Sequence, residues 1–173
     1  AADGDFTAAA LTLVEDGKAV HFPLSNGTQG VRGMAISPDG RYLAVAHVLS
    51  RYQVPTTQLD RGWMNTNAVT VIDTDEPDKP HPVLLDDPDA GAANPWGVSF
   101  SEDGGKLFVT HAGTHELSVI DFPALLERMK REGRSNEPVS ERLGFLHGLR
   151  TRIALPLNGP RAVDSDGKNV YVA

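Results

Sequence analysis

The sequence predicts an all-β fold made of repeated four-stranded antiparallel sheets, and an internal repeat is the first observation that leads to it. The segment GVRGMAISPDGRYLAVAH at residues 30–47 returns as NPWGVSFSEDGGKLFVTH at residues 94–111, and a shortened copy begins at Gly159. A repeat of this kind determines the architecture before any single residue is interpreted. The second observation is an Asp-Gly turn in the middle of each copy, with a strand on either side, which is typical of a β-hairpin.

Further strands lie between the copies and complete the repeating unit. Residues 68–73 and 116–121 are rich in Val and Ile, as strands usually are, and outer strands are expected at 81–85 and 152–157. The unit therefore has four strands, A to D, from the inside outward. Four-stranded units repeated around an axis are the blades of a β-propeller.

The chain starts and stops out of phase with this unit. We expect two full blades plus two half-blades in one partial β-propeller domain that covers residues 1–173. The expected parts are a half-blade of strands C and D at 9–24, a blade at 30–86 with a loop insertion at 48–66, a blade at 94–157 with a helical insertion at 122–150, and a half-blade of strands A and B at 159–173.

This set of blades cannot close a ring, since known propellers have at least about four blades. The open edges would expose unpaired backbone N–H and C=O groups, which invite another chain to pair. We expect the partner to be either the remaining propeller blades of a longer protein or a second copy of the chain, whose A and B strands would complete the first copy's half-blade. Alone, the chain should not behave as a closed monomer.

Composition excludes several classes of function. The formal net charge is −7 and the isoelectric point is about 5.3, which argues against binding to nucleic acid or to an anionic membrane surface. No apolar window of about 18 residues is present, so no membrane span is expected. The chain has no cysteine, which excludes disulfides, thiolate catalysis, cysteine-based zinc sites and covalently attached c-type haem within it.

Several segments resemble the YVTN-type β-propeller repeats of extracytoplasmic bacterial and archaeal proteins. These segments are Gly159-Pro160-Arg161, Ser37-Pro38-Asp39-Gly40, Tyr42-Leu43-Ala44-Val45 and Val69-Thr70-Val71-Ile72-Asp73. The resemblance covers nearly the whole chain except for the two insertions. It implies a repeat protein that acts in the periplasm or outside the cell and interacts with other proteins.

The long loop insertion narrows this resemblance. Residues 56–59 (TTQL) and 61–67 (RGWMNTN) are similar to a subgroup in which the propeller is joined to c-type cytochrome or di-haem peroxidase-like modules. This implies c-type haem on an adjoining domain or on a cytochrome-like partner. The Cys-x-x-Cys-His motif that binds haem in those modules is absent here, so we expect no cofactor in this chain.

Strand direction alternates within a blade, so the B-to-C and D-to-A connections share one face, which we call the top face. The B-to-C connection from His47 to Asn67 is much longer than its counterpart from His111 to His115, which indicates a functional element. Its aromatic, amide and basic side chains are suited to binding a ligand or partner: Arg51, Tyr52, Gln58, Arg61, Trp63, Asn65 and Asn67. The alternative is that the aromatic residues only seal the loop onto the propeller, with Trp63 at least half buried.

Three histidines share the top face. His47 and His111 occupy equivalent repeat positions, and His115 lies four residues after His111. Together, three imidazoles could bind a transition metal or lie beside a haem edge. The spacing of the last two falls across a turn, however, and is not a metal-ligand pattern. We therefore expect a hydrogen-bonding role for the histidines and no bound metal.

Arg32, Trp96 and Arg161 enter strand A, the innermost strand, at matching positions. They should therefore form a channel rim on the top face. A cationic rim could bind a carboxylate or steer an anionic partner. The alternative is that the two arginines bond neighbouring backbone carbonyls.

The helical insertion is expected on the opposite face. Asp121 is a suitable N-cap for a helix from Pro123 to Glu132. Leu125 begins a short apolar stripe on that helix, whereas Arg128 and the neighbouring charged side chains should be solvated.

No catalytic constellation is present. The sequence lacks a Gly-x-Ser-x-Gly elbow, a P-loop, a dinucleotide fingerprint and a His-Glu-x-x-His motif. The acidic stretch at residues 86–89 lacks the spacing of a calcium loop and is expected to be a solvated linker. We expect a non-catalytic scaffold or recognition module of an extracytoplasmic, redox-linked protein. The alternative is a propeller that contributes a substrate-binding face to a di-haem peroxidase-like or cytochrome c oxidoreductase.

Overall fold

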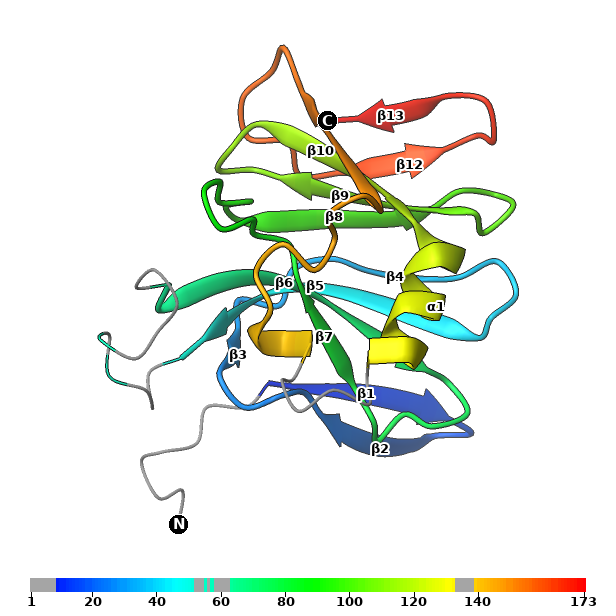
Figure 1. The fold of residues 1–173 in the computed structure, drawn as a ribbon. Helices are drawn as coiled ribbons and strands as arrows, with labels where there is room; N and C mark the ends of the chain where they lie inside the picture. Colours follow the sequence, from blue (N-terminus) through cyan, green and yellow to red (C-terminus); the bar gives the residue numbers. More distant parts are fainter. Residues whose placement is uncertain (1–8, 52–54, 56, 58–62, 133–138) are drawn as a thin grey trace.

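Antiparallel sheets stacked side by side make up the computed structural model of the chain, which describes residues 9–51, 55, 57, 63–132 and 139–173. Figure 1 shows the sheets following one another from the N-terminal strand pair at the bottom to the C-terminal pair at the top. Each sheet therefore packs beside its neighbour in the sequence, as the blades of a propeller do.

The strands form four sheets within the described residues. The N-terminal half-blade contains β1 (Ala10–Glu15) and β2 (Lys18–Pro23). Blade 1 contains β3 (Thr28–Gln29), β4 (Met34–Ile36), β5 (Tyr42–Ser50), β6 (Asn65–Asp73) and β7 (His81–Leu84). Blade 2 contains β8 (Pro95–Phe100), β9 (Lys106–His111), β10 (Glu116–Asp121) and β11 (Arg150–Ala154). The C-terminal half-blade contains β12 (Val163–Ser165) and β13 (Val170–Val172), and the helices are α1 (Phe122–Glu132) and the 3-10 helix η3 (Val139–Glu141).

The predicted all-β fold is confirmed, with two full blades, two half-blades and one short α-helix in the part of the chain that is described. In blade 2 the sheet order is β11-β10-β9-β8, and every pair in it is antiparallel. The A strands are β4, β8 and β12, and β8 contacts both of the others. The inner edge of the stack is therefore continuous from blade 1 to the C-terminal half-blade.

The strands of blade 1 reach farther than expected. β5 and β6 stay paired from Tyr42–Asp73 to Ser50–Asn65, so both ends of the loop insertion expected at 48–66 are strand. The short β3 also pairs with β5. Asn65 and Asn67 are consequently held on a strand rather than on a loop.

The predicted turns are present. The turn at residues 16–17 has positive φ at both positions, 49° and 73°, and joins the two N-terminal strands as a two-residue hairpin loop. The A-to-B turns of the two full blades use the same contact: the Ser37 hydroxyl donates to Asp39, and the Ser101 hydroxyl donates to Asp103. The sequence repeat therefore produces the same side-chain hydrogen bond in both turns.

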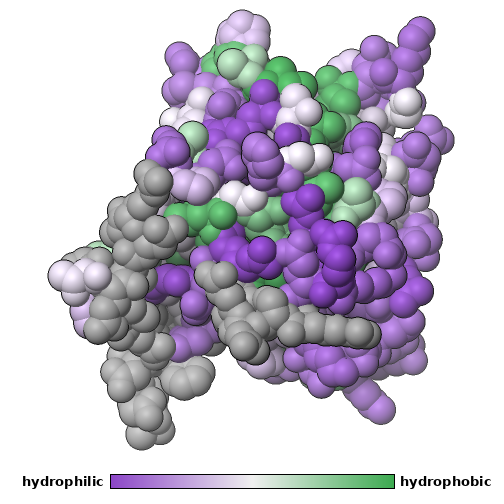
Figure 2. Space-filling view, in the orientation of Figure 1, coloured by the Kyte–Doolittle hydropathy of each residue, from purple (hydrophilic) through white to green (hydrophobic). Residues whose placement is uncertain are grey.

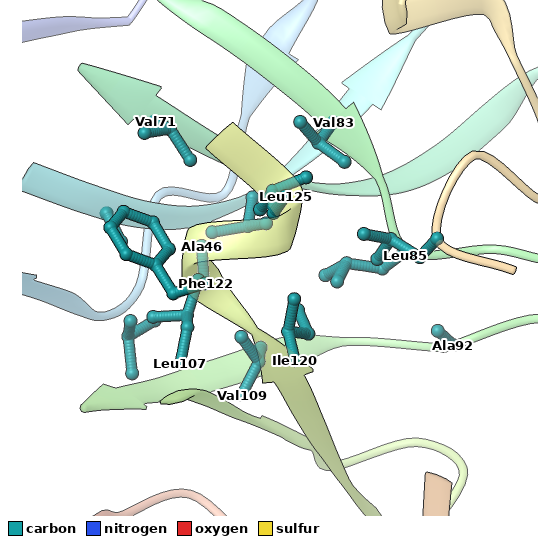
Figure 3. Close-up of a cluster of buried hydrophobic side chains, with 14 of the residues drawn as sticks. Ala46, Val71, Val83, Leu85, Ala92, Leu107, Val109, Ile120, Phe122 and Leu125 are labelled. Atoms are coloured by element: carbon teal, nitrogen blue, oxygen red, sulfur yellow. The ribbon is translucent and has the colours of Figure 1, made fainter. Parts of the chain in front are cut away.

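The main hydrophobic core lies between blades 1 and 2 and is covered by α1. Figure 3 shows the side chains that meet there: Val71, Val83, Leu107, Val109, Ile120, Phe122 and Leu125. Ile120 and Leu125 are fully buried, and burial of one such side chain stabilises the fold by roughly 1.5–3 kcal/mol. The helix is therefore part of the core that joins the two blades.

The insertion begins with the expected cap, since the Asp121 carboxylate accepts the N–H of Ala124 at 3.1 Å. Arg128 was expected to be solvated, and this was wrong. Its guanidinium donates to the carbonyl oxygens of Phe145 and His147, both at 2.8 Å, because the chain folds back beside the helix.

The return of the insertion corrects a second expectation. η3 packs against β7, and the segment reaches the top face. There, the Glu141 carboxylate lies 3.7 Å from Arg51 Nη2, and the Gly144 N–H donates to the Asp86 carbonyl at 3.1 Å. The insertion therefore connects both faces instead of staying on the face opposite the long loop.

Apolar side chains are exposed at both ends of the stack. Leu13 and Met34 are at least half exposed and line one apolar pocket between the N-terminal half-blade and blade 1. Tyr171 is equally exposed at the other end, and Figure 2 shows hydrophobic surface around the C-terminal half-blade at the top. In a complete propeller, the strands that each half-blade lacks would cover these side chains. Among the described residues, no helix is both long and apolar enough to cross a membrane.

Candidate functional site

The residues that we predicted to bind a ligand or partner belong to the top face, which is on the left of the stack in Figure 1. Three of them, Tyr52, Gln58 and Arg61, lie outside the described residues. The others belong to four groups, which are the histidines, the described ends of the long loop, a polar network around Asp86, and the channel rim.

His47 and His111 are fully buried. The Nε2 atom of His47 lies 2.6 Å from the Thr70 hydroxyl, and that of His111 lies 2.7 Å from the Ser118 hydroxyl, which occupies the equivalent repeat position. Because a carbonyl can only accept, His111 Nδ1–H donates to the Ala92 oxygen at 3.0 Å, and the serine hydroxyl then donates to Nε2. Neither ring presents a free nitrogen to the surface, so both leave the set of candidate ligand-binding residues.

Burial lowers the pKa of His47 and lowers that of His111 to about 4, so both rings are neutral at pH 7. His115 is exposed, and its Nδ1 accepts the N–H of Gly159 at 2.9 Å. Within the described residues, no group of three His, Asp or Glu side chains could hold a metal ion. The three histidines therefore do not converge on one site.

The described ends of the long loop are fixed by contacts with the propeller. Arg51 is paired with Glu141, and the Ser50 hydroxyl donates to Asn65 Oδ1 at 2.6 Å. Trp63 is more than half buried, as expected, and a Cβ on Gly91 would lie 3.2 Å from its ring. The indole thus packs on the linker between blades 1 and 2.

Asp86 is the centre of a polar network that the sequence did not reveal. Its carboxylate, in a residue only 1% exposed, accepts the Asn67 N–H at 2.6 Å, the Asn67 side-chain amide at 2.9 Å and the Ala92 N–H at 2.7 Å. The expectation of a solvated linker at residues 86–89 was therefore wrong for Asp86, whereas Asp89 is exposed. Asp86 is buried because it satisfies backbone N–H groups that the packing of the linker leaves without a carbonyl partner.

Asp87 joins two arginines of β11. Its Oδ2 lies 2.5 Å from Arg150 Nη2 and 3.3 Å from Arg152 Nη1, and Arg152 also pairs with Glu116. Burial alone would raise the pKa of Glu116, but the hydrogen bonds from Arg152 and Thr114 and the positive charge of Arg152 together outweigh it and lower that pKa. These ion pairs fasten the outer strand of blade 2 to the linker from blade 1, which is a structural role.

The channel rim consists of Arg32, Trp96 and Arg161, and the structure brings all three together. The guanidinium carbon of Arg32 lies 4.2 Å from the centre of the Trp96 ring, and that of Arg161 lies 4.6 Å from it. Both arginines are exposed, whereas the indole is partly buried. Each blade that flanks Trp96 therefore contributes one cation to the same aromatic ring.

Two glycines at equivalent repeat positions explain this stacking. A Cβ on Gly33 would lie 2.2 Å from the Trp96 carbonyl oxygen, and a Cβ on Gly97 would lie 2.8 Å from the Arg161 carbonyl oxygen. Because these residues lack a Cβ, the inner strands of successive blades can approach closely. The side chains that precede the glycines are thereby brought within stacking distance.

No protein-family model matches the chain. Its sequence is 27% identical over 164 residues to the hydrazine synthase subunit beta of Kuenenia stuttgartiensis, an alignment that covers 92% of this chain and 42% of that protein. Its fold matches a chain in the solved structure of Kuenenia stuttgartiensis hydrazine synthase with a TM-score of 0.82 and 22% sequence identity, over 99% of this chain and 53% of that one. The chain thus spans about half the length of the proteins it matches, and it shares their fold.

Proposed function

We propose that this chain is part of a non-catalytic β-propeller subunit that serves as a scaffold and recognition module in a multi-subunit redox enzyme. The observation that carries the proposal is the similarity to hydrazine synthase subunit beta along nearly the whole chain. The two buried histidines and the Asp86 network support it, because these polar groups are used to join strands within each blade and to fix the linker between blades 1 and 2.

We further propose that the enzyme acts outside the cytoplasm and that c-type haem is carried by an adjoining domain or by another subunit. Both points follow from the resemblance to extracytoplasmic YVTN-type propellers joined to cytochrome-like modules. The absence of cysteine in this chain is consistent with haem attachment elsewhere.

The test is to purify the tagged protein with its natural partners and to separate the subunits. We expect haem absorbance and turnover in the assembled complex, with the haem covalently attached to another polypeptide or another domain. The 173-residue chain alone should show neither. Haem binding or turnover by the chain alone would refute the proposal.

A second candidate is a propeller that contributes a substrate-binding face to the enzyme, and the two exposed arginines of the channel rim favour it. An Arg32→Gln subunit built into the complete enzyme separates the two functions. A substrate-binding face predicts a higher KM with the complex intact, whereas a scaffold predicts unchanged kinetics.

The exposed sheet faces at the two ends of the stack support further blades, or a second copy, as the structural partner. We predict that the isolated chain self-associates through these faces, and light scattering at micromolar concentration measures this. Leu13→Asp should reduce association, whereas the same change at Met64, an exposed apolar residue beside the long loop, should not. A monodisperse, folded monomer of 18.6 kDa would contradict this prediction.

A further inference from the structure

We propose that Arg32, Trp96 and Arg161 form a binding site for an oxyanion, such as a carboxylate or a sulfate-type anion, on the inner rim of the top face. This site is independent of the proposed function, since it is argued from the geometry of three side chains in this chain. It would exist whether or not the propeller belongs to a redox complex.

The two rim arginines differ from the other described arginines in their charged neighbours. Each of the other described arginines pairs with a carboxylate of this chain: Arg41, Arg51, Arg128, Arg131, Arg142, Arg150 and Arg152. Arg32 and Arg161 form no ion pair with any described residue, although the chain carries an excess of acidic residues and a net charge of −7. The rim is therefore a local positive site on an acidic protein.

The guanidinium groups of Arg32 and Arg161 are both placed against one aromatic ring. Both lie over the Trp96 ring, at 4.2 and 4.6 Å from its centre. A guanidinium that stacks through its flat face keeps the N–H donors along its edge available. Other arginines of the described chain donate to backbone carbonyls, whereas no such bond links either rim guanidinium to a described residue, which favours the stacked arrangement over the alternative that these two arginines bond neighbouring carbonyls.

The fold preorganises the three side chains of the rim. Two like charges on one ring repel, and a cation–π contact at an exposed position offsets this only weakly. The close backbone approaches at Gly33 and Gly97 nevertheless place the inner strands, and so the bases of the three side chains, near one another. An anion that accepts N–H donors from both arginines would remove the repulsion. Planar, paired donors of this kind are suited to carboxylate, phosphate and sulfate oxygens.

The oxyanion has two sources, a free anion or the carboxylate of an Asp or Glu side chain on a partner. The probes are sulfate and succinate, each titrated against sodium chloride at matched ionic strength. The readout is the fluorescence of Trp96 in a Trp63→Phe background, where Trp96 is the only indole. We expect a saturable change with at least one probe and none with chloride. Tighter binding of sulfate indicates a free inorganic anion, and tighter binding of succinate indicates a carboxylate source.

Two variants and one matched control test the assignment. Arg32→Gln and Arg161→Gln should each weaken binding about tenfold or more, because each removes charge-assisted hydrogen bonds. Arg41→Gln is the control, since Arg41 also lies over an aromatic ring, that of Tyr42 at 5.4 Å, but is paired with Asp73. It should leave binding unchanged.

The proposal remains testable if a glutamine variant folds poorly, because Arg32→Lys keeps the charge and loses the planar fork. It should bind more weakly than the parent and retain the parent's melting temperature. Absence of a saturable response to both probes in the folded parent chain would overturn the site. An equal loss of response in Arg41→Gln would also overturn it, since that result would reflect net charge alone.

Discussion

The top face carries two pairs of residues at equivalent repeat positions, the histidines His47 and His111 and the arginines Arg32 and Arg161. The two pairs have opposite environments in the structure. His47 and His111 are fully buried and bonded to hydroxyls that the repeat itself supplies, at Thr70 and Ser118. Arg32 and Arg161 are exposed, and no carboxylate among the described residues neutralises them. Position in a repeat therefore predicts where a side chain lies, while the partners present at that position decide whether it supports the fold or remains available for binding.

The largest effect that tests this comparison is expected from His111→Ala. The change leaves a cavity and removes the partners of the Ala92 carbonyl and the Ser118 hydroxyl, so we expect the free energy of unfolding to fall by about 3–4 kcal/mol. Urea denaturation followed by circular dichroism measures it. The matched control is His115→Ala, which should cost far less because His115 is exposed. Equal effects of the two changes would contradict the division between buried and exposed residues.

The same histidine should make stability depend on pH. The pKa of His111 is lowered from 6.5 to about 4 in the folded chain, mainly by burial, with the charges of Arg150 and Arg152 adding to the effect. As pH falls from about 6.5 toward 4, the unfolded chain takes up a proton that the folded chain does not, so stability is lost in that window. The loss from His111 should approach about 3 kcal/mol at pH 4.

His111→Gln is the control for this pH dependence, because an amide offers a donor and an acceptor without titrating. Urea midpoints measured between pH 4 and 8 should therefore decline less steeply with acidification in the variant than in the parent. Parallel declines would mean that other groups cause the acid sensitivity and that the ring is not buried in its neutral form.

The substitution Trp63→Ala tests whether this residue of the top face stabilises the fold or is available for binding a partner. The indole packs beside Gly91 on the linker that carries Asp86, so its removal should lower the free energy of unfolding by about 2–3 kcal/mol and the melting temperature with it. Thermal denaturation measures the change, with Met64→Ala, an exposed neighbour, as control. Unchanged stability combined with lost partner binding would move Trp63 from the scaffold to the binding surface.

The parts of this fold that the sequence predicted are those encoded locally. The Asp-Gly turns, the phase of the strands and the cap at Asp121 each depend on residues within a few positions of one another, and all are present. The stacked rim was also predictable, because Arg32, Trp96 and Arg161 recur at one repeat position. In a repeat protein, residues far apart in the sequence can be predicted to lie close together when they occupy equivalent repeat positions.

The parts that the sequence did not predict depend on contacts between segments without a repeat relation. Asp86 and Asp87 lie in a stretch whose composition is typical of a solvated loop, and their partners include Arg150 and Arg152 far along the chain. Those arginines meet the acidic pair only once blades 1 and 2 pack and the insertion returns across β7. A polar composition predicts that a segment is exposed to solvent. In this linker Asp86 is buried and Asp87 is ion-paired instead, because the packed blades contain N–H groups and arginines that would otherwise have no partner.

The smallest effect on stability is expected from Arg32→Gln, and it sharpens the comparison most. A cation–π contact at an exposed position stabilises the fold by about 0.5–1 kcal/mol. Removal of one of the two like charges on the Trp96 ring also relieves their repulsion, which offsets part of this loss. We therefore expect a change in the free energy of unfolding below about 1 kcal/mol, measured by urea denaturation in low salt. Arg161→Gln should behave alike, and the double variant should lose at most about 1 kcal/mol more than either single variant, because the second change removes a cation–π contact when no repulsion is left to relieve. A loss comparable to that of His111→Ala would show that the rim is a structural element of the blade interface, and the contrast between the two sets of repeat positions would no longer hold.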